Sequence, residues 1–386
     1  MAGVAFLAAD MLAELQYHFP MVQGLANKLF HLLGAAALLA FLSLAPLAHG
    51  LPVSGLYEQR VAVENESTAE RNRAYQVAFR RMILKVTGDE RWLESERIRG
   101  ASGNAGDFVQ AFAYTTEETA GRVAGLVAGQ RYIEVQFSAP LINQLLAADN
   151  IPVWGSNRPS VLVWMALQDA TGQRSLLNSE TGAEIIDYMR RFGEERGLPI
   201  IFPLLDLQDR RNLPVDAIWA QDELAIRTAS SRYDPDSILA GRLLFTATGE
   251  LVGLWQFQFM DEAQTFDGFD SELESYLEQP LTRITNQLAG HFGLVPGGQS
   301  EQSVRLRVDG IRDFSDYSAL VEYVRGIGLV QAADIVSVDG ERLELLLDLQ
   351  GSSDQLFDLI ALDRDLLPIN SGESADSPLL HYRWMR

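Results

Sequence analysis

Apolar and polar residues recur with two different periods along the chain, and these periods predict alternating strands and helices. Residues 56–63 and 132–137 alternate, as half-buried strands do. Between them, Tyr75, Phe79 and Met82 recur at helical spacing, after a capping box at Ser67 and Glu70. With a helix from residue 139, this pattern predicts an N-terminal α/β domain over residues 51–150.

The next segment is more apolar, which is typical of strands covered on both faces. Residues 161–167 form a continuous apolar run, and a second apolar strand is predicted at 198–205. Helices are predicted at 182–196, 216–232 and 271–291, and a hairpin joins strands at 237–246 and 251–260. Residues 151–295 are therefore predicted to form a central α/β domain with a mixed sheet.

A linker rich in Pro and Gly at residues 295–300 precedes a third regular segment. Val304, Leu306 and Val308 alternate, a helical stripe follows, and Asp339-Gly340 predicts a hairpin turn. A second helix and a strand over residues 380–384 complete the order βαββαβ, which is that of a ferredoxin-like sandwich. The fold class predicted for the chain is α+β, with three small α/β layered domains, the last of them ferredoxin-like over 301–386.

Residues 1–50 have the pattern of an export signal. An uncharged apolar run over 29–48 follows Lys28, and Ala48 and Gly50 fit cleavage near Gly50. Acidic residues precede any base in residues 1–20, so Met21 is an alternative start. The pattern predicts a periplasmic protein. A retained anchor in the inner membrane is the alternative, because about 18 apolar residues can span a bilayer.

Composition narrows the chemistry that the chain can perform. The 386 residues carry 31 Lys+Arg and 52 Asp+Glu, a net charge of −21, and no cysteine. Such acidity argues against a nucleic-acid binder, and the lack of cysteine excludes disulfides and thiol catalysis. Beyond residue 50 the histidines are His291 and His381, neither in a catalytic or zinc motif. No cofactor or metal is predicted.

Two groups of side chains are candidates for function in the central domain. Trp154, Arg158 and Trp164 form a candidate binding patch, since Trp and Arg are frequent in binding hot spots. The alternatives are that these side chains pack inside the protein, or that the junction over 154–159 captures a small ligand. Carboxylates also follow an apolar strand, and a pair of them could hydrolyse a glycosidic bond. These are Asp206, Asp209, Asp216, Asp222 and Glu223.

The first helix has a candidate basic face, away from its apolar stripe. Residues 51–150 have a net charge of −2, whereas residues 151–386 have a net charge of −18. A basic face on the near-neutral segment could contact anionic lipid, an acidic partner or the acidic remainder of the chain. The alternative is a solvated helix face. The residues are Arg71, Arg73, Arg80, Arg81 and Lys85.

Five separated stretches resemble an exported proteobacterial family. They are Arg71-x-x-Ala74 with residues 82–88, residues 151–159 leading into the apolar strand, 197–199, 203–206 and 238–243. Together they resemble the family catalogued as domain of unknown function 2066, over roughly residues 51–295. The resemblance implies no catalytic residues. We therefore expect an uncharacterised, non-catalytic accessory or binding module of the cell envelope with an envelope protein as its partner. The alternative is a metal-free envelope hydrolase that uses an Asp/Glu pair.

Overall fold

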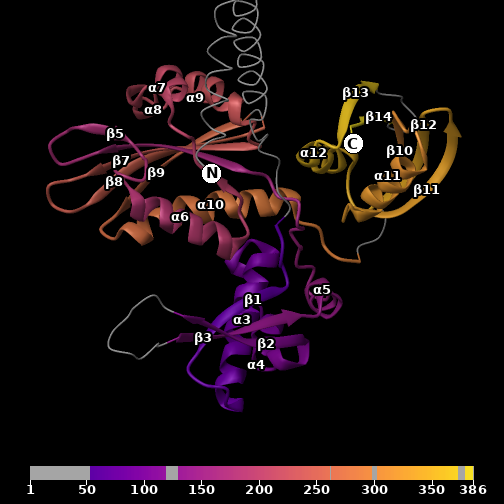
Figure 1. Ribbon diagram of the computed structural model, residues 1–386, viewed down its shortest axis with the longest axis horizontal. Helices are drawn as coiled ribbons and strands as arrows, with labels where there is room; N and C mark the ends of the chain where they lie inside the picture. Colours follow the sequence, from indigo (N-terminus) through magenta and orange to yellow (C-terminus); the bar gives the residue numbers. More distant parts are fainter. Residues whose placement is uncertain (1–52, 119–128, 261, 298–301, 373–378, 386) are drawn as a thin grey trace, which may run out of the picture. The chain divides into compact units, whose positions relative to one another are not determined.

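The computed structural model describes residues 53–118, 129–260, 262–297, 302–372 and 379–385 (Figure 1). These residues belong to one compact unit, a mixed α+β structure with three β-sheets. The predicted export signal over residues 1–50 lies outside the described residues. In the ranges just given, no helix has both the length and the apolar character needed to cross a membrane.

The first sheet has the strand order β1-β3-β2, and both pairs of strands are antiparallel. Helix α3 begins as predicted, because the Ser67 side chain accepts a hydrogen bond from the Glu70 backbone N–H, and it ends at Gly88. The predicted stripe of α3 packs against the inward side chains of the sheet. Strand β2 was not predicted. The elements are β1 (Glu58–Val63), α3 (Thr68–Thr87), η1 (Glu90–Glu94), α4 (Glu96–Gly103), η2 (Ala105–Phe108), β2 (Val109–Glu118), β3 (Gly129–Phe137) and α5 (Ala139–Ala147).

The central sheet has the order β5-β4-β7-β8-β9, with β6 paired to β4. It is mixed, as predicted, because β4 is parallel to β6 and β7 while the other pairs are antiparallel. The elements are β4 (Val161–Gln168), β5 (Arg174–Leu176), α6 (Ala183–Arg196), β6 (Ile200–Ile201), α7 (Leu207–Asn212), α8 (Val215–Trp219), α9 (Glu223–Ser230), η3 (Ser231–Tyr233), β7 (Ser237–Phe245), β8 (Leu251–Phe259), β9 (Glu262–Asp270) and α10 (Leu273–Phe292).

Strand β4 is buried on both faces, which confirms the prediction for residues 161–167. Val163 and Met165 belong to a core that includes apolar residues of α6 and α10. Trp164 and Ala166 point to the other face and share a core with apolar residues of α8 and α9. Alternate side chains of one strand thus supply two separate cores.

The C-terminal sheet has the order β11-β12-β10-β14-β13. The predicted strands and helices are present, but a further strand, β13, precedes the closing strand β14. A single strand after α12 would run antiparallel to β10. Because β13 and β14 are antiparallel, β14 instead lies parallel to β10. The ferredoxin-like order βαββαβ is therefore not confirmed. The elements are β10 (Gln302–Asp309), α11 (Phe314–Gly326), β11 (Val330–Asp339), β12 (Arg342–Leu349), α12 (Ser353–Asp363), β13 (Leu366–Gly372) and β14 (Leu379–Trp384).

Candidate functional site

The candidate carboxylates of the hydrolase alternative follow strand β6, where the chain turns into the short helix α7. Leu205 has a positive φ of 54°, and this turn places Asp206 at the N-terminus of α7. Oδ1 of Asp206 accepts hydrogen bonds of 3.0 Å from the backbone N–H groups of Gln208 and Asp209. Asp206 is therefore a helix cap, which is a structural use of a carboxylate.

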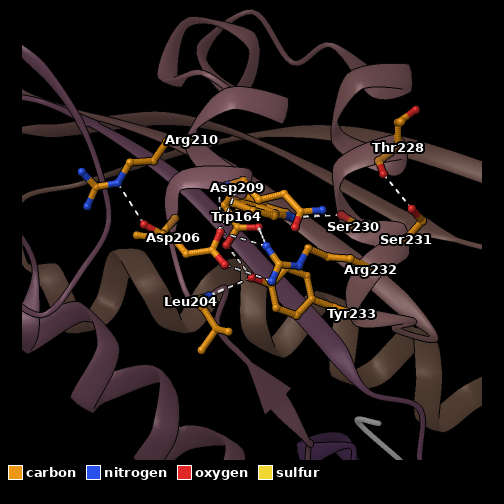
Figure 2. Close-up of polar contacts among 12 residues, drawn as sticks. Trp164, Leu204, Asp206, Asp209, Arg210, Thr228, Ser230, Ser231, Arg232 and Tyr233 are labelled. Atoms are coloured by element: carbon orange, nitrogen blue, oxygen red, sulfur yellow. Dashed lines mark hydrogen bonds and ion pairs between the residues drawn. The ribbon is translucent and has the colours of Figure 1, made fainter. Parts of the chain in front are cut away.

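A single arginine joins Asp206 to Asp209. Figure 2 shows Asp206, Asp209, Arg232 and Tyr233 directed toward one another. Nη1 of Arg232 donates to Oδ1 of both aspartates at 2.9 Å. The Tyr233 hydroxyl donates to Oδ2 of Asp209 at 2.5 Å and accepts from the Leu204 N–H at 2.9 Å. Asp209 is 1% exposed, so its carboxylate is held within the protein by these donors.

The hydrogen bonds and burial in this cluster move the pKa values of Asp206 and Tyr233 further from neutral pH. The hydrogen bonds from Arg232 lower the pKa of Asp206 to about 2. Burial, followed by the bond to Asp209, raises the pKa of Tyr233 to about 12. At neutral pH Asp206 is an anion and Tyr233 is neutral. Neither group has the pKa near 7 that suits proton transfer.

Each of the other three candidate carboxylates has a bonding partner of its own. Asp216 forms an ion pair with Arg174 at 2.9 Å. Asp222 caps helix α9, and Glu223 pairs with Arg227 one turn later on the same helix. The structure therefore brings together Asp206 and Asp209 alone out of the five predicted carboxylates.

The histidines of the described chain also pair with carboxylates. Nε2 of His291 lies 2.9 Å from Asp358, and Nε2 of His381 lies 3.0 Å from Asp309. Within the described ranges, no group of three or more His, Asp or Glu side chains is placed to hold a metal ion.

Arg158 is the most extensively bonded side chain of the predicted binding patch. It is 1% exposed, and its guanidinium carbon lies 4.2 Å from the centre of the Trp154 ring. Its five N–H groups donate at 2.7–3.0 Å to the backbone carbonyl oxygens of Lys85, Trp154, Gly155, Arg196 and Gly197.

Three of these five carbonyls come from the ends of two helices. Lys85 lies in the last turn of α3, and Arg196 and Gly197 end α6. The last carbonyls of a helix lack partners within the helix and carry the negative end of its dipole. They therefore compensate a buried cation without a carboxylate. Burial lowers the pKa of Arg158 to about 9, which leaves it protonated at neutral pH.

Further contacts reinforce this junction between α3 and the central sheet. Nη2 of Arg196 donates to the Gly88 carbonyl at 2.9 Å and to Oδ1 of Asn286 at 3.1 Å. The Trp154 N–H donates to the Val86 carbonyl at 2.8 Å. A Cβ on Gly88 would lie 2.6 Å from the Trp154 ring, so the helix end and the indole are in close contact. We call this group of contacts the Arg158 junction.

The exposed patch predicted at Trp154, Arg158 and Trp164 is not formed. All three side chains are buried. Trp154 and Arg158 pack on each other at the junction, whereas Trp164 lies in the core on the other face of β4. Its Nε1 donates to Oγ of Ser230 at 2.9 Å (Figure 2). Packing, the alternative stated above, accounts for all three.

Local contacts engage three of the five residues of the predicted basic face of α3. Arg73 pairs with Glu70 at 2.7 Å, and the Arg71 guanidinium lies 5.5 Å from the centre of the Phe112 ring. Lys85 is half-buried and donates to the Gly55 carbonyl at 3.3 Å, and burial lowers its pKa. Arg80 and Arg81 remain exposed, and neither pairs with an acid of the described chain.

Lys85 lines two surface hollows. One, of about 530 Å³, is lined by residues of β1, β2 and β3. The other, of about 370 Å³, is lined by the end of α6 and by Val53 and Ser54. The sequence predicts Lys85 on the basic face and Arg158 in a separate patch. The two residues are joined by a hydrogen bond from the Arg158 guanidinium to the backbone carbonyl of Lys85. A backbone acceptor leaves no signal in the sequence pattern.

Comparisons with known proteins add a family of unknown function. Residues 51–155 match the family described as "Domain of unknown function (DUF8605)". This is an uncharacterised family, but it is not the family 2066 expected from the sequence. No curated protein matches the chain. A solved structure titled "Crystal structure of uncharacterized protein" is 12% identical, covers 35% of this chain and 88% of its own, and has a TM-score of 0.11.

Proposed function

We propose that this protein is a non-catalytic accessory or binding module of the cell envelope, exported to the periplasm. The observation that carries the proposal is the bonding of Asp206 and Asp209, the two candidate carboxylates that lie together. Arg232 binds both Asp206 and Asp209, and Tyr233 occupies the remaining oxygen of Asp209. The carboxylates that a hydrolase would use instead hold α7 and η3 together.

The alternative is a metal-free hydrolase, and its chemistry makes a specific demand. One carboxyl group must be protonated near neutral pH to act as the acid, while the other remains free to act as base or nucleophile. With its pKa at about 2, Asp206 cannot donate a proton near neutral pH. Asp209 is buried, and each of its carboxylate oxygens accepts a hydrogen bond. The pair therefore favours a structural role.

The exposed arginines of α3 are the first binding surface that we propose. Arg80 and Arg81 lie on the segment with a net charge of −2, which allows an acidic partner to approach with little repulsion. The Arg158 junction fixes the end of this helix to the central sheet. The proposed partner is an acidic surface of an envelope protein. Peripheral contact with anionic lipid is the competing outcome of the test.

Crosslinking in intact cells tests this surface. A photo-crosslinking amino acid at position 81 should give one discrete protein adduct in the envelope fraction, and Arg80→Glu should remove it. Arg211, exposed on α7, is the matched control position. The absence of an adduct at position 81 would overturn this surface. Salt-sensitive cosedimentation with anionic vesicles, without a protein adduct, would replace the protein partner by lipid.

A second measurement addresses catalysis and location. The purified protein should release no product from isolated cell-wall material. Hydrolysis that Asp206→Asn abolishes without lowering the melting temperature would establish the hydrolase. Recovery of the protein in the cytoplasm after cell fractionation would contradict export.

We also infer that the C-terminal sheet is a ferredoxin-like sandwich extended by one strand. Its support is the order β11-β12-β10, in which a helix connects β10 to β11 and a hairpin connects β11 to β12. An experimental structure in which β13 pairs directly with β10 would refute the added-strand arrangement.

A further inference from the structure

Strand β11 forms one edge of the C-terminal sheet (Figure 1). It pairs with β12 along one side, and no strand of the described chain pairs with its other side. Alternate residues between 332 and 339 direct their backbone N–H and C=O groups toward that side. An open edge of this kind is a template for another strand.

Three apolar side chains are exposed on this edge strand. Ile335, Val336 and Val338 are 44%, 48% and 61% exposed. A register shift between Ile335 and Ser337 marks a bulge at Val336. The bulge takes Val336 out of the regular alternation, so apolar side chains stand next to one another at the rim.

Helix α11 adds an aromatic residue at the same end of the sheet. In the strand register, Arg342 lies opposite Asp309 at the end of β10 and opposite Asp339 at the end of β11, so both strands end on the same side of the sheet. Phe314, the first residue of α11, follows the last residue of β10 by five positions. It is 79% exposed and stacks on Tyr317, with ring centres 5.8 Å apart.

Other edge strands of the described chain lack this combination. Strand β13 contains Pro368, which cannot donate a backbone hydrogen bond. Strand β9 exposes one large apolar side chain, Phe269, and β2 likewise exposes Phe112. The β11 edge is distinguished by three exposed apolar residues and the absence of proline.

The charges beside the edge define the chemistry of its partner. Asp334, Asp339 and Glu341 are exposed, and none forms an ion pair within the described chain. A strand that approaches from the open side meets apolar side chains flanked by carboxylates. Charge complementarity therefore favours a segment in which apolar residues alternate with lysine or arginine.

We propose that the β11 edge binds an extended, apolar and basic segment of a partner protein, which adds a strand to the C-terminal sheet. Backbone hydrogen bonds along the edge supply attachment, while Ile335, Val336 and Val338 select apolar side chains. This surface is separate from Arg80 and Arg81, so its test can fail while the proposed envelope function stands.

The test uses a fluorescent ten-residue peptide of alternating valine and lysine, with binding followed by anisotropy. Binding should saturate, and Ile335→Thr and Val338→Thr should each raise Kd about fivefold, because threonine keeps the strand but removes apolar contact. Phe269→Thr, on edge strand β9, is the matched control and should leave Kd unchanged. All three positions are exposed, and unchanged melting temperatures will verify that the variants are folded.

Three outcomes would overturn the proposal. The first is no saturable binding. The second is equal binding of a peptide whose valines are replaced by proline, since attraction of lysines to an acidic surface would then suffice without a strand. The third is a concentration-dependent dimer in sedimentation that Val338→Thr abolishes, because a second copy of the chain would then be the occupant of this edge.

Discussion

Replacing Arg158 should weaken the whole junction between α3 and the central sheet. Arg158→Ala removes the donors of five carbonyl groups at once, three of them in buried and two in half-buried hydrogen bonds. Each unsatisfied acceptor costs about 1 kcal/mol at the low end of the usual range, and water entering the space recovers part of that cost. For five acceptors, less the part that water recovers, we expect a loss of about 3–5 kcal/mol in the free energy of unfolding.

Scanning calorimetry and circular dichroism can measure this effect on the full chain. A loss of this size lowers the melting temperature by on the order of 10 °C for domains of this length. Because the junction couples two sheets, the calorimetric transition should also broaden or separate into two. Arg158→Met should lower the free energy of unfolding nearly as much as Arg158→Ala, since methionine restores side-chain volume but no hydrogen-bond donors.

Arg190→Ala is the matched control. Arg190 lies on α6, as do the Arg196 contacts of the junction, but its side chain is 61% exposed and its ion pair with Asp187 is 4.0 Å long. Such a pair contributes about 0–1 kcal/mol. The reasoning is refuted if the melting temperature of Arg158→Ala equals that of Arg190→Ala. It is also refuted if Arg158→Met has a higher melting temperature than the parent protein.

Three further predictions concern single groups. Gly197→Ala should lower the melting temperature by several degrees, because its φ is +65° and the new Cβ would lie 2.5 Å from Nη1 of Arg158; Gly100→Ala, with open space around it, should not. The raised pKa of Tyr233, about 12, means that its contribution to stability is present below pH 10 and lost as pH rises toward 12. Tyr233→Phe should therefore flatten the dependence of unfolding free energy on pH in that window, and an unchanged slope would contradict the assignment. For Asp206, with its pKa lowered to about 2, the contribution is present above pH 4 and lost as pH falls toward 2. Asp206→Asn should make acid unfolding, measured by circular dichroism, less steep over that interval.

Sequence periodicity located the elements whose boundaries depend on local chemistry. Ser67 caps α3 and Gly88 ends it, as the pattern predicts. The capping box itself is half formed, because Glu70 Oε1 accepts from the Glu64 N–H and not from Ser67. The predicted helix over 216–232 is divided into α8, α9 and η3, with Gln221 at a φ of +56° between the first two. Hydrogen bonds between residues close in the chain set these helix boundaries.

Strand β13 shows why a strand can escape a sequence prediction. Residues 366–372 contain Pro368, which argues against a central strand. An edge strand tolerates proline on its open side, and β13 is an edge strand. Whether a segment lies at the edge depends on the neighbours that it finds in the folded sheet, which no local pattern contains.

The sequence by itself determined the alternation of strands and helices, the doubly buried strand β4 and the hairpin at Asp339-Gly340, because each depends on residues close together in the chain. Tertiary structure decided the roles of the chemistry-bearing side chains. Arg158 meets carbonyls 73 and 38 residues away, and Asp209 meets Arg232 across 23 residues. From the sequence alone, Trp154 and Arg158 suggest an exposed binding patch. In the folded protein, carbonyls from two helix ends and from the segment before β4 surround Arg158. Burial and partners arise from packing, so they became visible only when distant segments came together.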